Sequence, residues 1–146
     1  MKILSWSVPG LGNPRASLKY ILQTHRPQIV FICETKMRPM QMDVVRAELK
    51  FENYFTIGRN GLGGGLTMLW SSDIAINIAS YSQHHIDAEI CNEGGQNWRC
   101  TGVYGHPETT QKRHTWTLMK RLANLSLLPW LCFGDFNEIL HLHEKK

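Results

Sequence analysis

The chain has no long apolar run and no sustained apolar stretch near its beginning. Its longest purely apolar run, Ile29–Cys33, holds five residues, far too few to cross a bilayer. Met1–Leu4 passes directly into Ser5, without the apolar core of a secretory signal. We therefore expect no membrane contact and an intracellular protein, nuclear or cytoplasmic, that is not secreted.

The chain also has few cysteines, and none of them forms a C-x-x-C pair. The four lie in or beside strand-like apolar segments, at Cys33, Cys91, Cys100 and Cys132. Isolated cysteines in such segments are usually buried, and a metal site needs closer spacing. The placement therefore predicts buried free thiols in a reducing compartment, ahead of disulfides or a zinc site.

Charge of one sign is only slightly in excess. Sixteen Lys and Arg face twelve Asp and Glu, giving +4. The excess lies in residues 1–73, with nine basic and five acidic side chains, whereas residues 74–146 hold seven of each. A basic half favours a polyanion, but the excess is modest, and an ordinary solvated surface explains it better.

The first elements are a strand, a helix and a second strand. Residues 2–8 alternate between an apolar face and a smaller, more polar face, which is typical of a strand. Asn13 as N-cap and Pro14 as first residue predict a helix that stops before Pro27. Residues 28–33 are almost all apolar, which predicts a strand buried on both faces. Together they make a βαβ unit.

The middle of the chain predicts a helix and then many short strands. The helix covers Pro39–Lys50. Candidate strands follow, separated by turn-forming pieces, at residues 53–58, 65–70, 74–80, 85–91 and 97–104. Such dense spacing predicts antiparallel neighbours.

Another helix and another strand follow. The helix covers Thr110–Leu125, with an expected apolar stripe of Trp116, Met119, Leu122 and Leu125. Its basic residues are expected on a solvated edge, with a phosphate contact as the alternative: Lys112, Arg113, Lys120 and Arg121. Leu128–Phe133 predicts a buried strand. With no repeat or linker, the pattern predicts one α/β layered domain with a mixed sheet.

Two acidic residues follow predicted buried strands. Glu34 comes directly after residues 28–33, and Asp135 follows Leu128–Phe133 by one glycine, with Asn137 two residues on. In open α/β sheets the ligand crevice lies beyond the carboxyl ends of the strands. Two carboxylates there could hold a hard divalent cation such as Mg²⁺. Position alone leaves solvated loop acids as the favoured alternative.

The histidine pairs and glycine-rich stretches predict no further site. His84–His85 and the pair His141 and His143 lack cysteines at zinc spacing, so we expect them to face solvent. Gly10–Gly12 predicts a tight strand-to-helix turn, and Gly61–Gly65 a hairpin connection. Neither matches a nucleotide-binding fingerprint.

Five segments in order resemble the endonuclease/exonuclease/phosphatase family. They are KILSWSVPGLG (2–12), PQIVFICETK (27–36), GGLTMLW (64–70), TGVYGHPE (101–108) and PWLCFGDFNE (129–138). The resemblance runs along essentially the whole chain. Within the family, the sequence is most similar to the endonuclease domain of plant LINE-type (non-LTR) retrotransposons.

The resemblance implies a fold and a chemistry. The fold is a four-layer α-β-β-α sandwich of two mixed sheets with helices outside. Family members hydrolyse phosphoester bonds with Mg²⁺ or Mn²⁺, and the retrotransposon branch nicks DNA. Carried over by motif, Glu34 ligates the metal and Tyr104 contacts the scissile phosphate. Asp135 orients or activates the attacking water, and Asn137 helps to hold the phosphate or metal environment.

Three positions depart from the family pattern. Ser7 stands where the family usually has Asn, close to the metal. Pro9 replaces a residue that is often basic in the retrotransposon branch. After the tyrosine, His106–Pro107 stands where an Asn is common. The shorter Ser7 lacks an amide, which affects how an ion or phosphate is positioned there.

The family's last strands supply an Asp and a catalytic His near a Ser-Asp-His motif, which residues 1–146 do not contain. His141 and His143 follow Asp135 too closely to replace that His. The resemblance therefore implies a C-terminally truncated, partial domain over residues 1–146. Loss of the His implies a rate lowered by orders of magnitude.

Three functions remain open. The first is a metal-dependent DNA endonuclease, impaired in this chain. The second is a non-catalytic remnant or a weak nucleic-acid-binding module. The third is a small-molecule phosphatase of the same family. In each case a missing strand would expose a sheet edge and apolar inner faces, so we also expect self-association.

Overall fold

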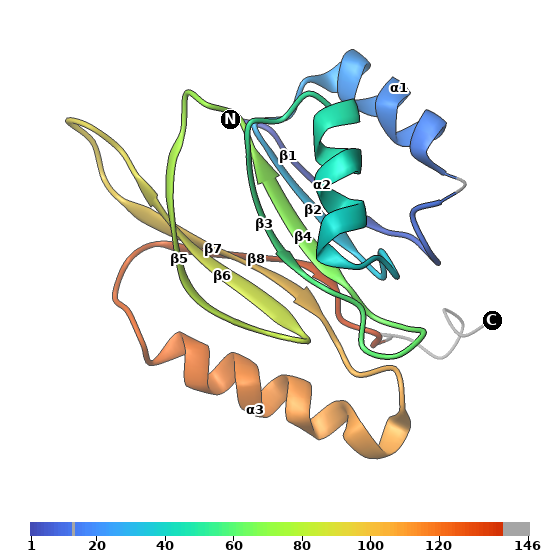
Figure 1. The fold of residues 1–146 in the computed structure, drawn as a ribbon. Coiled ribbons are helices and arrows are strands. Elements are labelled where there is room, and N and C mark those ends of the chain that lie inside the picture. The colour runs from blue at the N-terminus through green and yellow to red at the C-terminus, as the bar shows by residue number, and fades with distance from the viewer. Residues whose placement is uncertain (13, 139–146) are drawn as a thin grey trace.

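The computed structural model describes residues 1–12 and 14–138, which form two four-stranded sheets (Figure 1). The strand orders are β1-β2-β4-β3 and β5-β6-β7-β8. The strands are β1 (Ile3–Ser7), β2 (Ile29–Cys33), β3 (Asn53–Ile57), β4 (Leu66–Trp70), β5 (Ala75–Ser82), β6 (His85–Cys91), β7 (Trp98–Tyr104) and β8 (Trp130–Asp135). The pairs β1–β2 and β7–β8 are parallel, and the other neighbouring pairs are antiparallel, as the spacing predicted.

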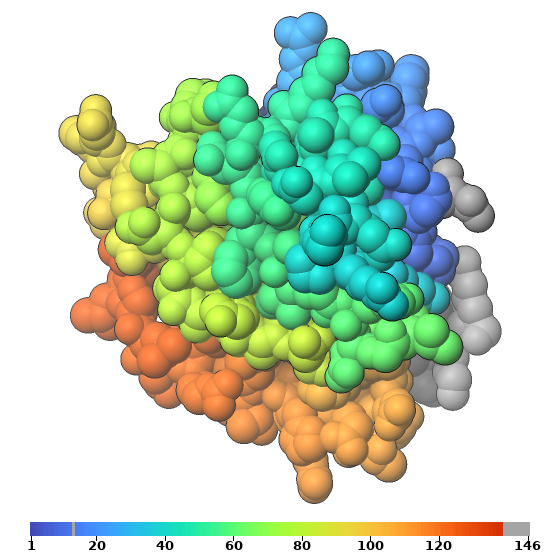
Figure 2. All heavy atoms as spheres, in the orientation of Figure 1, coloured from blue at the N-terminus to red at the C-terminus, as the bar shows by residue number. Residues whose placement is uncertain are grey.

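Helices cover the outer faces of both sheets. Helices α1 (Arg15–His25) and α2 (Pro39–Glu48) lie on the first sheet. The 3-10 helix η1 (Thr109–Gln111) and helix α3 (Lys112–Ala123) lie on the side of the second sheet. Figure 2 shows α2 on the near face and α3 along the lower edge, with the sheets filling the space between. The four-layer α-β-β-α sandwich and the opening βαβ unit are therefore confirmed.

Strand alternation divides the interior into two apolar cores. Leu4 of β1 and Val30 of β2 pack beneath the helices of the first sheet. Ile3 and Phe31, on the opposite faces of the same strands, pack between the two sheets. There the Phe31 ring meets Phe133 of β8 edge to face, with centroids 5.8 Å apart. All five residues of β2 are fully buried, which confirms the predicted burial on both faces.

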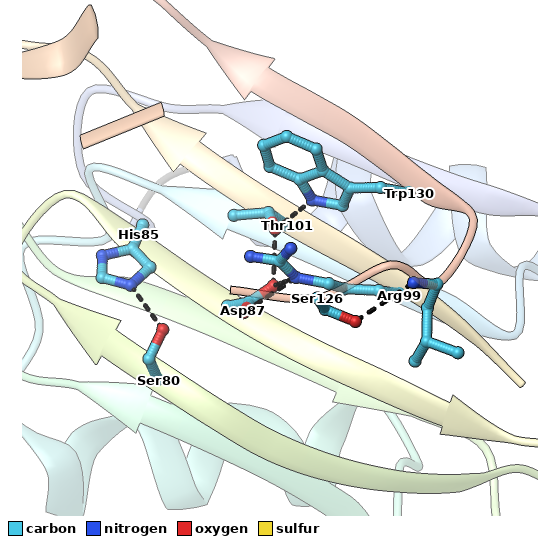
Figure 3. A network of polar contacts seen from close by, with 8 residues as sticks. Ser80, His85, Asp87, Arg99, Thr101, Ser126 and Trp130 are labelled. Carbon is cyan, nitrogen blue, oxygen red and sulfur yellow. Dashed lines mark hydrogen bonds and ion pairs between the residues drawn. The ribbon is translucent and has the colours of Figure 1, made fainter. Parts of the chain in front are cut away.

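The face of the second sheet away from the first carries a buried polar network (Figure 3). Arg99 Nε donates to both carboxylate oxygens of Asp87, at 2.8 and 3.0 Å. Thr101 Oγ1 donates to Asp87 Oδ1 at 2.7 Å and accepts a hydrogen bond from Trp130 Nε1 at 2.8 Å. The Arg99 guanidinium also lies 4.6 Å from the Trp130 ring centroid. These contacts join β6, β7 and β8.

The predicted apolar stripe of α3 is wrong in part. Leu122 is buried, but Trp116 is 44% and Leu125 is 62% exposed, and the other buried positions are Thr115 and Leu118. Residues three apart fall about 60° short of a full turn at each step, so the expected positions wind around the helix. Positions 115, 118 and 122 instead stay on one face. Trp116 lies outside this face and stacks on Phe136. The helix also ends at Ala123, before Leu125, rather than at Leu125 as predicted.

The predicted burial of the last strand is also wrong. β8 begins at Trp130, extends through Asp135 and is only partly buried, with Leu131 46% exposed. The reason is its position, because β8 is an edge strand of the second sheet over the described residues. An apolar run predicts a strand, but the neighbouring strands decide how deeply it is buried.

Two smaller predictions are corrected. His85 was expected to face solvent but is 3% exposed, with Ser80 Oγ 3.0 Å from its Nε2 and Ser82 Oγ 2.6 Å from its Nδ1. Pro14 lies at the N-cap position of α1 rather than at its first helical residue. The expected cap Asn13 and the histidines His141 and His143 lie outside the described residues.

The burial predicted for the cysteines is confirmed for Cys33 and Cys100, whereas Cys91 and Cys132 are only partly buried. None of the helices within residues 1–12 and 14–138 has the length and hydropathy to cross a membrane.

Candidate active site

Two parallel strand pairs bring the predicted site residues to one end of the sandwich. In the first sheet Ser7 lies opposite Cys33, and Glu34 follows directly. In the second sheet Tyr104 lies opposite Asp135. The edge strands β1 and β8 are in contact, so the carboxyl ends of both pairs meet. The structure thus places Glu34 directly after β2 and Asp135 at the last residue of β8, at the strand ends where α/β sheets bind ligands.

The backbone of Glu34 is held in an unusual conformation. Its φ angle is 60°, in the left-handed region that non-glycine residues rarely adopt. Neighbouring hydrogen bonds hold it there: Gly10 N–H donates to the Glu34 carbonyl at 2.9 Å, and Thr35 N–H donates to the Gly65 carbonyl at 3.2 Å. Such a conformation costs about 1–3 kcal/mol, and it is most often found at functional sites.

Asp135 and Asn137 are positioned by the backbone around them. Gly134 has φ +131°, and a Cβ there would collide with the Val103 carbonyl oxygen, so only glycine fits. Asp135 Oδ1 accepts a hydrogen bond from Asn137 N–H at 2.9 Å. Asn137, itself left-handed with φ 53°, donates from Nδ2 to the Gly105 carbonyl at 2.6 Å. The carboxylate and the amide are therefore fixed next to the end of β7.

Tyr104 lies between Glu34 on one side and Asp135 and Asn137 on the other, and it is 9% exposed. Burial raises its pKa, and a hydrogen bond with the Glu34 carboxylate raises that pKa further. A hydrogen bond with Asn137 opposes these effects, whereas the charge of Asp135 adds to them. The phenol therefore stays protonated at neutral pH and keeps an O–H that can be donated.

Ser7 and Cys33 lie opposite each other at the last positions of β1 and β2. Burial raises the pKa of Cys33 to about 11, a hydrogen bond with Ser7 opposes the rise, and the nearby charges of Asp135 and Glu34 add to it. The thiol is therefore protonated at neutral pH and is neither a nucleophile nor a good metal ligand. Ser7, where the family usually has Asn, lies beside Cys33.

The oxygen donors suit a hard cation. Carboxylates at Glu34 and Asp135 and the amide of Asn137 are ligands that Mg²⁺ accepts, and Mg²⁺ is often bound by only one or two carboxylates together with water and phosphate. Within residues 1–12 and 14–138, no three side chains of the His, Cys, Asp and Glu types are grouped to hold a metal ion. The candidate ligands for the ion are therefore the carboxylates of Glu34 and Asp135, together with neutral oxygen groups such as the Asn137 amide.

One neighbour of the site was missed by sequence reasoning. His84 lies in the turn between β5 and β6, and its ring is parallel to the Tyr104 ring with centroids 6.3 Å apart. His84 Nδ1 donates to the Tyr104 carbonyl at 2.8 Å. The pairing of β6 with β7 brings them together, because His85 lies opposite Val103. The sequence contains no local signal of this register.

Solved structures with the same fold have varied activities. The endonuclease domain of TRAS1, a telomere-specific non-LTR retrotransposon, superimposes with a TM-score of 0.71 at 12% identity, over 95% of this chain and 61% of that one. D. rerio TDP2 complexed with a single-strand DNA product gives 0.70 at 17% identity, over 95% and 61%. The Bacteroides thetaiotaomicron mannosyl-6-phosphatase Bt3783 gives 0.70 at 15% identity, over 97% and 67%. At these identities the likeness shows the shared fold.

The chain spans 58% to 67% of the length of the solved structures most similar to it. No curated protein sequence matches it. A sequence model of the Endonuclease/Exonuclease/phosphatase family, however, matches residues 4–145. With its two-sheet sandwich and the site at the strand ends, the chain belongs to the Endonuclease/Exonuclease/phosphatase family.

Proposed function

We propose that this chain is a Mg²⁺-dependent phosphodiesterase domain that acts on DNA, an endonuclease of the non-LTR retrotransposon type. The observation that carries the proposal is the convergence of Glu34, Tyr104, Asp135 and Asn137 at one end of the sandwich. Two of the four have a left-handed backbone. In a family of phosphoester hydrolases, this arrangement is best explained as a catalytic site.

Each residue has a role that fits its surroundings. Glu34 holds the ion, which, when bound, neutralises charge on the phosphate oxygens; Mn²⁺ can replace Mg²⁺. The protonated Tyr104 donates its O–H to a non-bridging phosphate oxygen. Asp135, held by the Asn137 N–H, accepts a proton from the attacking water at a carboxylate oxygen. Asn137 donates to the carbonyl of Gly105, directly after Tyr104, and so helps to hold the phosphate environment.

The retrotransposon assignment rests on motif order. The segments 64–70, 101–108 and 129–138 strengthen the resemblance to the family, and within it the sequence resembles the plant LINE-type branch. The shared fold with the TRAS1 endonuclease domain supports the same branch, and the D. rerio TDP2 complex supports DNA as the ligand class. On this proposal the protein works where chromosomal DNA is, in the nucleus.

A plasmid-nicking assay tests the proposal. The purified chain is incubated with supercoiled plasmid and Mg²⁺ or Mn²⁺, alongside Glu34→Gln and Asp135→Asn, and open-circular product is measured. We expect slow nicking by the unmodified chain and a rate at least about 100-fold lower in either variant, because each removes a charge that acts on the reacting phosphate or water. Glu93→Gln is the matched control, since this exposed carboxylate lies in the turn between β6 and β7.

Nicking that persists equally in Glu34→Gln, Asp135→Asn and Glu93→Gln would show that neither Glu34 nor Asp135 is needed for it and would refute the assigned site. No nicking at any metal concentration would favour the second function, a non-catalytic remnant or weak nucleic-acid-binding module. That function is favoured by Ser7, whose hydroxyl is shorter than the amide that the family usually places there.

A small-molecule phosphatase is the third candidate. It is supported by the fold shared with the mannosyl-6-phosphatase Bt3783. The same assay distinguishes it, with inositol phosphates or mannose 6-phosphate replacing plasmid and released phosphate as the readout. Release that is lost in Asp135→Asn, together with an intact plasmid, would favour the phosphatase over the nuclease.

A further inference from the structure

A row of four rings leads away from the candidate active site. The Tyr104 ring lies parallel to His84 with centroids 6.3 Å apart, and His84 stacks on His106 at 3.6 Å. His106 in turn meets His114 edge to face at 5.6 Å. The rings come from β7, the β5–β6 turn, the loop after β7 and α3. The tertiary fold therefore gathers three histidines from three separate segments beside one tyrosine.

Hydrogen bonds hold the row in place. Tyr104 N–H donates to the His84 carbonyl at 2.9 Å, and His84 Nδ1 donates back to the Tyr104 carbonyl at 2.8 Å. His106 N–H donates to Thr115 Oγ1 of α3 at 3.0 Å, and Thr115 is buried. Asn137 Nδ2 donates a hydrogen bond to the carbonyl of Gly105, the residue between Tyr104 and His106 in the chain. The row is thus a preformed surface, attached to the site residues themselves.

A pocket of about 270 Å³ lies along the three histidines of the row. Besides these rings its polar lining consists of Arg121 and the hydroxyl groups of Ser82 and Thr117. His84, His106 and His114 line it together with Arg121, and no carboxylate is among the lining residues. Burial is the main cause that lowers the pKa of His106, and the neighbouring His84 and His114 lower it further. Only the exposed Glu108 opposes the shift. An anion in the pocket would favour the protonated form of His106 and so oppose this shift.

We propose that this pocket binds a phosphate of the nucleic-acid strand next to the phosphate that is cleaved. The proposal rests on the function proposed above and names a second contact for the same substrate. Imidazole N–H groups and a guanidinium are donors that suit phosphate oxygens. Tyr104 of the candidate site and His106 of the pocket are only two residues apart in the chain. The pocket therefore lies beside the reacting centre, within reach of a neighbouring phosphate.

The test measures binding without catalysis. A short fluorescein-labelled DNA duplex is titrated with the full chain in EDTA, and anisotropy gives Kd at several salt concentrations. Arg121→Gln and His114→Gln remove pocket groups that are exposed on α3, so neither should disturb the fold. We expect about a tenfold rise in Kd for Arg121→Gln, with a salt slope lower by about one, because one phosphate contact is lost. His114→Gln should raise Kd in the same direction.

Lys120→Gln is the matched control, because it removes the same charge from the neighbouring residue of α3 but does not line the pocket. If Lys120→Gln weakens binding as much as Arg121→Gln, or if neither does, the pocket is not a phosphate site and the proposal is refuted. Nicking of plasmid by the unmodified chain would leave the proposed function standing in that case. A selective effect of Arg121→Gln without any nicking would support the pocket and contradict catalysis.

Titration with inorganic phosphate distinguishes a phosphate of a nucleic acid from a small free phosphate as the ligand of the pocket. The imidazole NMR signals of His84, His106 and His114 are followed during titration with the duplex and with inorganic phosphate. Shifts that require the duplex would support a nucleic-acid subsite. Saturable shifts of the same size with inorganic phosphate, and none with the duplex, would assign the pocket to a small phosphate and overturn the proposal.

Discussion

At the scale of single residues, the site depends on backbone conformations that few residue types tolerate. Gly134 stands at φ +131° directly before Asp135, and Glu34 and Asn137 lie in the left-handed region. Only glycine is tolerated at position 134, because a Cβ there would collide with the Val103 carbonyl oxygen. Glu34 and Asn137 are not glycines, so their side chains are kept despite the strain, as expected where the side chain is needed for function.

The buried ion pair of the second sheet gives a stability prediction. Asp87 and Arg99 are 1% and 3% exposed, and Thr101 also donates to Asp87. Asp87→Asn leaves the guanidinium buried without its counter-charge, so we expect the free energy of unfolding to fall by about 3–5 kcal/mol. Urea denaturation measures it. The control is Asp43→Asn, which breaks the exposed pair with Arg46 and should change stability little.

If Asp87→Asn were as stable as the unmodified chain, the network in Figure 3 would not be needed to hold the second sheet together. Arg99 Nη1 and Nη2 have no hydrogen-bond partner among the described residues. The charge of Arg99 is therefore balanced chiefly by Asp87 and by the face of Trp130. This dependence on few partners is the reason to expect a large effect.

His85 gives a prediction of pH dependence. Burial, more than any nearby charge, lowers its pKa below the ordinary 6.5. The unfolded chain therefore takes up a proton at higher pH than the folded chain, so this contribution to stability is complete above about pH 6.5 and is lost as pH falls. We expect the free energy of unfolding to decrease from pH 7 toward about pH 5. Urea denaturation at each pH measures the slope.

Replacing the side chain tests the source of that slope. His85→Asn should flatten the pH dependence, whereas His25→Asn, at an exposed position of α1, should leave it unchanged. Some slope should remain, because the pKa of His106 is lowered as well. Equal slopes in the unmodified chain and His85→Asn would show that burial of His85 does not control stability in this range.

At the scale of elements, α3 has a buried face that differs from the predicted one. Leu122 is 1% exposed and Leu125 is 62% exposed, although both belong to the expected stripe. Leu122→Ala should therefore lower the free energy of unfolding by about 2–5 kcal/mol, because it leaves a cavity against the second sheet. Leu125→Ala makes the same chemical change at an exposed position and should have little effect. Thermal or urea denaturation compares them.

Similar losses of stability in the two variants would mean that Leu125, just beyond the end of α3, is packed as the expected stripe requires. The distinction matters for function, because the orientation of α3 decides which basic residues reach the histidine row. With Leu118 and Leu122 buried, Arg121 lines the pocket and Lys120 does not. Lys112, at the start of the helix, instead pairs with Glu138 at 2.9 Å, beside the site.

At the scale of the whole molecule, the edges of the two sheets predict self-association. β1 and β8 are edge strands over the described residues, and Ser5, Ser7 and Leu131 on them are exposed. Unpaired edges and exposed inner faces favour pairing with another chain. We expect analytical ultracentrifugation to show a mass above 16.8 kDa that rises with concentration. Leu131→Lys on β8 should shift the equilibrium toward monomer, and Leu62→Lys, exposed in the β3–β4 loop, should not.

A strictly monomeric chain with one sharp, cooperative melting transition would contradict that prediction. It would mean that the edges of β1 and β8 are protected well enough for residues 1–146 to behave as a self-sufficient unit. Either result bears on catalysis, because both edge strands carry site residues, Ser7 on β1 and Asp135 on β8.

The sequence by itself determined the local elements and the family. Alternation in residues 2–8 and the apolar run 28–33 are local periodicities, and β1 and β2 follow them. The segments that carry Glu34, Tyr104, Asp135 and Asn137 are short motifs, which a family model also matches. Their presence at strand ends could be read from the sequence because a strand end is a local feature.

Only the tertiary structure decided how these pieces meet. The contact of β1 with β8 brings the two strand pairs together, and the register of β6 against β7 sets His84 beside Tyr104. The burial of Asp87 with Arg99 and the orientation of α3 likewise follow from packing between layers. The physical reason is that periodicity reports which face of an element is apolar. Pairing between distant segments depends on long-range contacts that no single segment encodes.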